Sequence, residues 1–218
     1  GSGHPDSEYE AAGATMMDSH AEVFARGELI VKVKEPQAEE IPMLRPGQML
    51  FTYLHLAASK SLTETVVGTG VTGIAYDKNE AKITLVNVAD QPGIAASIFG
   101  PLSEAEINVD MIVQNVSPDG ETTNMTFTVT EADFDRAVAM LEGRKDELNY
   151  QQIMADRNVV KISVVGVGMR SHAGVAQRMF SALADRSVNI QVISTSEIKV
   201  SVLISEDYLE LALRALHT

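Results

Sequence analysis

The sequence predicts an α+β protein in which one unit occurs twice. The first observation is a strand, a glycine turn, a helix and a strand between Lys82 and Asn115. The second is that the same order returns between Lys161 and Glu197, with Gly174 matching Gly93. The third is that residues 1–76 have a different pattern, in which strands alternate with helices. Agreement over more than twenty positions indicates an internal duplication preceded by a small α/β layer.

Composition restricts the function classes. The 218 residues are 45% hydrophobic and 22% charged, which is typical of a folded, soluble protein. The net charge of -13 opposes nucleic-acid binding. We expect no membrane span, because no apolar run reaches about 18 residues. We also expect no secretion signal, because no basic region followed by an apolar core stands at the start of the sequence. The sequence has no cysteine, which excludes thiol catalysis and agrees with a cytoplasmic location. No spacing of His, Asp and Glu predicts a metal site, and we expect no cofactor.

The first 76 residues predict a small parallel layer. Ser19 is a candidate cap for a helix that ends near Arg26. Alternating or apolar runs predict strands, and the polar stretch between the last two suits a helix. The expected elements are a short strand at 14–17, strands at 29–33, 49–54 and 71–76, and a helix at 59–69.

Three segments of this layer resemble the N-terminal substrate domain of alanine dehydrogenases: LIVKVKEP (29–36), LRPGQMLFTYLHLA (44–57) and GVTGIAY (70–76). The resemblance implies a partial, Rossmann-like fragment in which Lys34 and His55 match substrate-binding residues. The alternative is that Lys34 is a solvated strand-end lysine and His55 a loop residue. We favour the alternative, because the opening strand of that family and a Gly-x-Gly-x-x-Gly turn that opens a helix are both missing. We therefore expect no dehydrogenase activity and treat Lys34 and His55 as vestigial.

The first repeat, defined here as residues 82–156, begins with a strand and a helix. Ile83, Leu85 and Val88 alternate along the strand. The predicted helix after Gly93 has one apolar face, formed by Ile94, Ala95, Ile98, Phe99 and Leu102. A strand at 109–113, a strand at 125–129, a helix with Phe134, Ala137, Val138 and Leu141 on one face, and a weaker strand near 151–154 follow.

The second repeat, defined as residues 157–218, ends with a strand and a helix. The strand is expected at 200–204, and Ser205 is a candidate cap for the helix. We expect the buried face of this helix to hold Tyr208, Leu211, Ala215 and Leu216. No fourth strand follows in the sequence, which would leave one edge of a four-stranded sheet uncovered.

From residue 71 onward the chain strongly resembles the regulatory region of aspartate kinases. The segments that carry this resemblance are AYDKNEAKIT, ADQPGIAASIFGPL, INVDMIVQNVS, VGVGMRSHAGVA and NIQVISTSEIKVSVLI. It covers about two thirds of the chain and implies tandem ACT domains, each a ferredoxin-like βαββαβ sandwich. The resemblance also implies that a strand before the first ACT domain completes the second sheet. The expected domains are 1–70, a shared strand and hairpin at 71–81, then 82–156 and 157–218.

The segment GVTGIAY suits both families, so the chain changes from one resemblance to the other within a shared strand. Natural recombination, an engineered fusion and an assembly error would all produce such a chimera, and the residues do not distinguish them.

The glycine turns suggest a site for a free amino acid. A helix N-terminus has unpaired N–H groups and a positive dipole end, and both favour a carboxylate. Asp90 is placed to take the ammonium, and Gln114 has a donor and an acceptor for a side-chain hydroxyl. The alternative is that residues 90–93 form only a turn. By resemblance, the effector-binding residues are Asp90, Gly93, Ile94, Ala95, Gln114 and Asn115 in the first repeat, and Ser171, His172, Gly174, Val175, Asn189, Gln191, Thr195 and Ser196 in the second.

The resulting hypothesis is an allosteric module of amino-acid biosynthesis that binds lysine, threonine or both, without a kinase catalytic domain. We expect no catalytic residue in this chain. The resemblance also implies a homodimer formed through the ACT sheets, with a kinase catalytic subunit as a further partner. The alternative is a non-catalytic remnant that serves only as a dimerisation module. The motifs do not identify the amino acid, because lysine- and threonine-sensing members share them.

Overall fold

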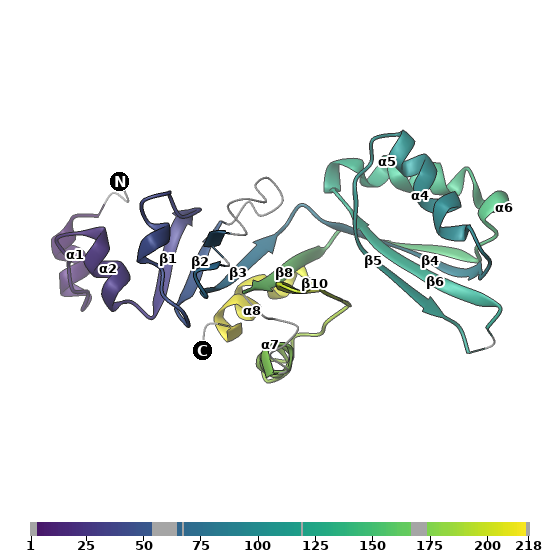
Figure 1. Ribbon diagram of the computed structural model, residues 1–218. Helices are drawn as coiled ribbons and strands as arrows, with labels where there is room; N and C mark the ends of the chain where they lie inside the picture. Colours follow the sequence, from purple (N-terminus) through teal and green to yellow (C-terminus); the bar gives the residue numbers. More distant parts are fainter. Residues whose placement is uncertain (1–3, 54–64, 67, 119, 167–173, 217–218) are drawn as a thin grey trace. The chain divides into compact units, whose positions relative to one another are not determined.

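A computed structural model describes residues 4–53, 65–66, 68–118, 120–166 and 174–216 (Figure 1). The chain divides into two compact units, one formed by residues 1–75 with 165–167 and the other by residues 76–164 with 168–218. Each unit is described by itself.

The first unit is a parallel layer, as the strand and helix alternation predicted. Its elements are α1 (Asp6–Ala11), α2 (His20–Arg26), β1 (Leu29–Lys34), the 3-10 turn η1 (Ile41–Met43), β2 (Met49–Tyr53) and the start of β3 (Thr72–Asp77). Strand β2 lies between β1 and β3 and is parallel to both. The Ser19 hydroxyl accepts the N–H of Glu22, which confirms the predicted cap of α2. No strand forms at 14–17, and most of the helix expected at 59–69 lies outside the described residues.

This unit has a core of its own. Buried side chains from α2, β1, β2 and the flanking loops pack together: Phe24, Ile30, Leu44, Leu50, Val66 and Val71. Buried Gln48 links the end of α2 to β2, because its amide donates to the carbonyls of Phe24 and Gly27 at 2.9 and 2.7 Å. These contacts join α2, β1 and β2 in one packed layer.

The first repeat has the βαββαβ order that the periodicity predicted. Its elements are β4 (Ala81–Ala89), α4 (Ile94–Glu104), β5 (Val109–Val116), β6 (Thr122–Val129), the 3-10 turn η2 (Glu131–Asp133), α5 (Phe134–Glu142), α6 (Lys145–Leu148) and β7 (Gln152–Asp156). The sheet is antiparallel with the order β5-β6-β4-β7, and the helices cover one of its faces (Figure 1). Ile83 and Leu85 from β4, Ile98 and Leu102 from α4, and Phe127 from β6 are all fully buried there.

The connection from β3 to β4 is not a hairpin. Strand β4 has β6 on one edge and β7 on the other, so neither edge is free for β3. Residues 78–80 have no regular structure, and the N–H of Asn79 donates to Asp77 Oδ1 at 2.9 Å. The hairpin expected at 71–81 was therefore wrong. Completion of the second sheet by residues 71–76 stays a prediction.

The second repeat contains β8 (Val159–Val165), α7 (Gly174–Ala184), β9 (Val192–Thr195), β10 (Lys199–Ser205), the 3-10 turn η3 (Glu206–Tyr208) and α8 (Leu209–Leu216). Strand β10 lies between β8 and β9 and is antiparallel to β9. The predicted burial of Tyr208 and Leu211 is wrong, since 44% and 38% of these residues are exposed. Because η3 delays the start of α8, its buried face consists of Leu209, Ala212 and Ala215.

Candidate functional site

The first glycine turn lies between β4 and α4. Gly93 has φ +91°, a left-handed conformation that L side chains rarely adopt, and a Cβ placed on it would meet nothing within 4 Å. Asp90, Gln91 and Pro92 are exposed around it, whereas the next side chain, Ile94, is buried in the core. The turn is therefore open to solvent on the side where α4 begins.

The start of α4 offers free hydrogen-bond donors. The N–H of Ile94 is taken by the carbonyl of Gln91, and the N–H of Ser97 by the carbonyl of Gly93. Within the described chain, the N–H groups of Ala95 and Ala96 have no backbone acceptor outside the helix. No side chain caps this end of the 11-residue helix. Two unpaired amides and the positive end of the helix dipole suit a carboxylate.

Asp90 and Gln114 come together beside this turn. Gln114 Nε2 donates to Asp90 Oδ1 at 3.4 Å, and both residues are exposed. Asn115 does not join them. It pairs with Asn124, whereas Gln114 pairs with the buried Met125, so the two neighbours lie on opposite faces of the sheet. The structure therefore brings Asp90 and Gln114 together and separates them from Asn115. Their role in binding an effector stays a prediction.

The second glycine turn is only partly described. Ser171 and His172 lie outside the described residues. Gly174 begins α7, where a Cβ would meet nothing within 4 Å, and Val175 is half-buried beside it.

The remaining predicted residues of the second repeat spread along β9. Asn189 is exposed before the strand, Gln191 adjoins its start, and Thr195 and Ser196 lie at its end. Four residues of extended chain span about 13 Å, which is too far for Gln191 and Thr195 to hold the same small group. Gln191 also has a partner already, because its Oε1 accepts a hydrogen bond from Lys82 of the first repeat. Sequence reasoning missed Lys82, whose role depends on contact between the repeats.

The vestigial residues Lys34 and His55 are only partly described. Lys34 ends β1, where it is exposed and pairs with Tyr53 of β2. His55 lies outside the described residues.

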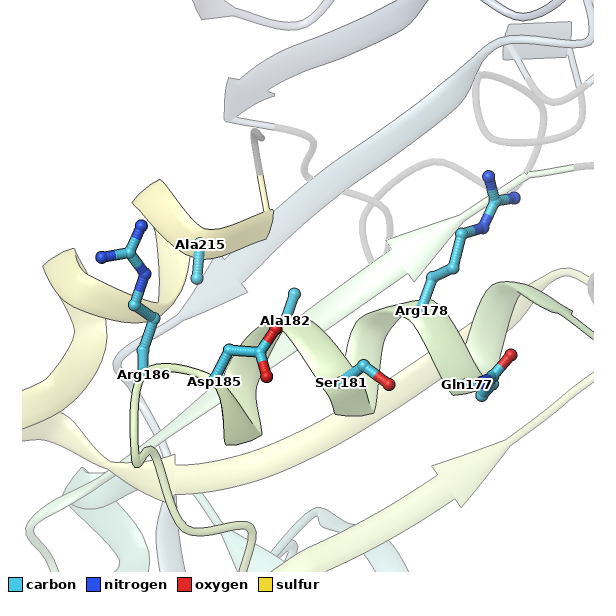
Figure 2. Close-up of a pocket in the computed structure, with 7 residues that line it drawn as sticks. All are labelled: Gln177, Arg178, Ser181, Ala182, Asp185, Arg186 and Ala215. Carbon is cyan, nitrogen blue, oxygen red and sulfur yellow. The ribbon is translucent and has the colours of Figure 1, made fainter.

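A pocket of about 420 Å³ lies elsewhere, between α7 and α8 (Figure 2). Figure 2 shows the side chains of Arg178 and Arg186 rising from the same side of the α7 segment, with the Asp185 carboxylate between their positions. None of the residues that the sequence predicted for a site lines this pocket. Its lining is Gln177, Arg178, Ser181, Ala182, Asp185, Arg186 and Ala215.

Two further observations concern the described part of the chain. It contains no group of three or more His, Asp and Glu side chains that could hold a metal ion. None of its helices is long and apolar enough to cross a bilayer.

Two protein families match the sequence. The ACT domain family matches residues 83–144 and 162–218. The N-terminal domain of alanine dehydrogenase and pyridine nucleotide transhydrogenase (PNT) matches residues 1–86.

Curated relatives are aspartate kinases. One from Stutzerimonas stutzeri is 52% identical over 167 residues, which is 77% of this chain and 39% of the relative. One from Pseudomonas fluorescens is 57% identical over 148 residues, or 68% of this chain and 36% of the relative. The chain thus spans well under half the length of these relatives.

Solved structures match about two thirds of the chain. A chain from the aspartokinase alpha and beta subunits is 50% identical with a TM-score of 0.62, covering 66% of this chain and 95% of that one. The ligand-free regulatory subunit of aspartate kinase from Thermus thermophilus is 40% identical with a TM-score of 0.62, covering 66% and 94%. Both matches therefore cover nearly all of the solved chain, and one of these chains is a regulatory subunit.

Proposed function

This chain belongs to the ACT domain family, among the regulatory regions of aspartate kinases, and we propose that its first glycine turn binds free lysine or threonine as an effector. The observation that carries this proposal is the Asp90–Gln114 pair, 3.4 Å apart, beside a helix N-terminus with open amides.

The three groups of an amino acid find complementary partners there. Its carboxylate would accept the N–H groups of Ala95 and Ala96, with the dipole of α4 adding attraction. Its ammonium would pair with Asp90. The amide of Gln114 would then be free to bond a side-chain hydroxyl or amine. Gly93 lets the ligand approach the backbone, because a side chain at this position would stand in the open space.

The second repeat would supply a related site. Thr195 and Ser196 match Gln114 and Asn115 of the first repeat, given the superposition of Gly174 on Gly93. Gln191 does not belong to it, since the Lys82 contact and its distance from Thr195 assign it to the contact between the repeats.

We also propose that the module works in a cytoplasmic assembly. A homodimer formed through the ACT sheets and a kinase catalytic subunit are the partners that its relatives suggest. The kinase activity of those relatives belongs to longer proteins, of which this chain matches 39% and 36%.

A second candidate function is dimerisation without a ligand. Ile112 on β5 and Ile193 on β9 hold matching positions in the duplication, and 52% and 45% of these residues are exposed. Exposed apolar residues on edge strands favour pairing with another chain.

Calorimetric titration with threonine and with lysine tests the effector hypothesis. We expect wild type to bind at least one of them at millimolar concentration or below. Asp90→Ala should weaken binding roughly a hundredfold, because the ammonium loses its charged partner. Gln114→Ala should cost about 1 kcal/mol, the typical value of a neutral hydrogen bond, and should affect threonine more than an effector without a hydroxyl.

Asp146→Ala, which removes an exposed carboxylate from α6, is the matched control and should bind like wild type. If wild type binds neither amino acid while remaining dimeric, dimerisation is the better assignment. If Asp90→Ala binds the amino acid as tightly as wild type does, the ligand binds at another site.

A further inference from the structure

Two lysines at matching positions each contact a residue of the other repeat. Lys82 and Lys161 each begin the repeated stretch. Lys82 donates to Gln191 of the second repeat. Lys161 contacts Asp110 of the first repeat, with Nζ 2.9 Å from Oδ2. Asp110 and Gln191 also match one another, since both lie 17 residues after the superposed glycine. The exchange is therefore reciprocal, as across a two-fold axis.

An apolar contact lies at the centre of this exchange. Met111 of β5 and its counterpart Val192 of β9 belong to one buried cluster, together with Val159 and Leu203. Val113 packs against the cluster from the side. The two repeats thus meet through equivalent residues, with a lysine on either side.

The two lysines differ in how strongly they are held. Lys161 contacts Glu80, which is 5% exposed, as well as Asp110, and it lies 3.9 Å from Asp77. Only 13% of its side chain is exposed. Burial lowers the pKa of Lys161, but Glu80 and Asp110 together raise it overall. Glu80 precedes β4 and Asp110 lies near the start of β5, so one ammonium holds the beginnings of both strands across β6.

Asp110 also holds an unusual turn of the backbone. Its Oδ1 accepts the N–H of Met111 at 2.8 Å while its Oδ2 accepts Lys161. Met111 has φ +47°, which is uncommon for a residue with a side chain. The β5–β6 register shifts between Asp110 and Val113, which identifies this turn as a β-bulge. Such a conformation persists only where its surroundings hold it.

The bulge decides which face Gln114 occupies. Side chains alternate along a strand, so one residue more or less between Asp110 and Gln114 moves Gln114 to the other face of the sheet. We propose that Lys161, a residue of the second repeat, is a positioning residue for the candidate site of the first repeat: by holding Asp110 it maintains the bulge that places Gln114 beside Asp90.

Amide hydrogen exchange of the full chain, measured by NMR without ligand, tests the structural step. In Lys161→Met the Met111 amide should exchange at least about tenfold faster than in wild type, because Glu80 and Asp110 lose their shared cation. Lys161→Arg, which keeps the charge, should restore most of the protection. Lys82→Met, the matched variant of the reciprocal contact, should leave the Met111 amide within about threefold of wild type.

Unchanged Met111 exchange in Lys161→Met would overturn the proposal. So would an equal loss of protection in Lys82→Met, because the contact as a whole would then matter rather than Lys161. If Lys161→Met does not fold, Asp110→Asn replaces it. That variant keeps an acceptor for the Met111 N–H but loses the charge that attracts Lys161, and it should give the same faster exchange.

Calorimetry with threonine and lysine tests the consequence for binding, which rests on the proposed function. Lys161→Met should lower the affinity for the amino acid that wild type binds by about five- to tenfold. Adding Gln114→Ala to Lys161→Met should cost less than Gln114→Ala costs in wild type, because the two residues act through one contact. If wild type binds neither amino acid, the proposed function fails and the exchange data alone decide the role of Lys161. If wild type binds and Lys161→Met binds equally well, Lys161 does not position the site.

Discussion

Gly93 and Met111 both have positive φ, and they reach it for different reasons. Glycine adopts φ +91° at little cost, so the turn at Gly93 can be recognised from the residue type. Methionine at φ +47° has no such signature. Asp110 and contacts from the second repeat hold it, and those contacts exist only in the folded chain.

Gly93→Ala should destabilise the protein by about 1–2 kcal/mol, the cost of a left-handed conformation for an L residue. No atom stands where the methyl group would go, so backbone strain alone is responsible. Gly174→Ala is the control. This glycine begins α7 with equally open space and no positive φ, so alanine there should stabilise the protein by about 0.4–1 kcal/mol. In urea unfolding, the free energy of unfolding should therefore fall for Gly93→Ala and rise for the control. A change in the same direction for both variants would contradict this explanation.

The free energy of unfolding should depend on Asp110 in acid. Burial raises the pKa of this carboxyl, but Lys161, the Met111 N–H and Lys199 lower it overall below 3.8. A lowered folded pKa contributes stability above the unfolded value and loses it as pH falls through the folded value. Asp110→Asn should therefore be less stable than wild type by about 1 kcal/mol near pH 6. The difference in the free energy of unfolding between wild type and Asp110→Asn should shrink below pH 3.8. A difference that stays constant from pH 6 to 3 would exclude a contribution of the Asp110 carboxylate to stability.

Helix α4 shows what periodicity predicts well at the scale of one element. Ile94, Ile98 and Leu102 are buried at the expected spacing, while Ala95 of the predicted face is exposed. Helix α8 shows where periodicity fails. A 3-10 turn precedes it, so counting from the Ser205 cap assigns the wrong face. The period determines that a face exists, but the exact start of the helix determines which residues form it.

Leu102→Ala should lower the free energy of unfolding by about 2–5 kcal/mol, because the side chain is fully buried and leaves a cavity. Ser103→Ala, one position along and exposed, should change it by less than about 0.5 kcal/mol. Chemical denaturation of the two variants measures the contrast. A loss below about 1 kcal/mol for Leu102→Ala would mean that the site collapses around the smaller residue.

The exposed Ile112 of β5 should contact a second copy of the chain, beside the contact that Met111 makes with β9. Ile112 is 52% exposed on this strand, and a charge there should oppose contact with the second copy. Light scattering at micromolar concentration should give twice the monomer mass of 23.5 kDa for wild type and a lower average for Ile112→Lys. Asp146→Lys on α6 is the control and should remain dimeric. A wild-type mass equal to that of the monomer would count against this prediction.

At the scale of the whole molecule, the chain combines a parallel layer with a duplicated sandwich. The first unit has its own buried cluster around Leu50, and the first repeat has another around Phe127. Two families match these parts, and their matches overlap at residues 83–86. This overlap lies in β4, the strand that follows β3.

Two truncations test whether β3 completes the second sheet. Deleting residues 1–68 retains Thr72–Asp77 and should leave the melting temperature of the repeats nearly unchanged. Deleting residues 1–81 should lower it, because the second repeat loses the strand that we expect to cover its edge. The longer deletion also removes Glu80, so Glu80→Gln within the shorter one separates the effect of losing that carboxylate. Equal melting temperatures for the two truncations would exclude the shared strand.

The sequence alone determined the duplication and the positions of most strands and helices. These follow from local periodicity and from glycine at one turn, which depend on residues close together in the chain. Only the tertiary structure decided that Asn115 points away from Gln114, that Gln191 bonds Lys82, and that Lys161 reaches Asp110. Each of these depends on one bulge or on contact between the repeats. Residues about 50 to 110 positions apart in sequence become neighbours only when the two sandwiches pack, and no local pattern encodes that packing.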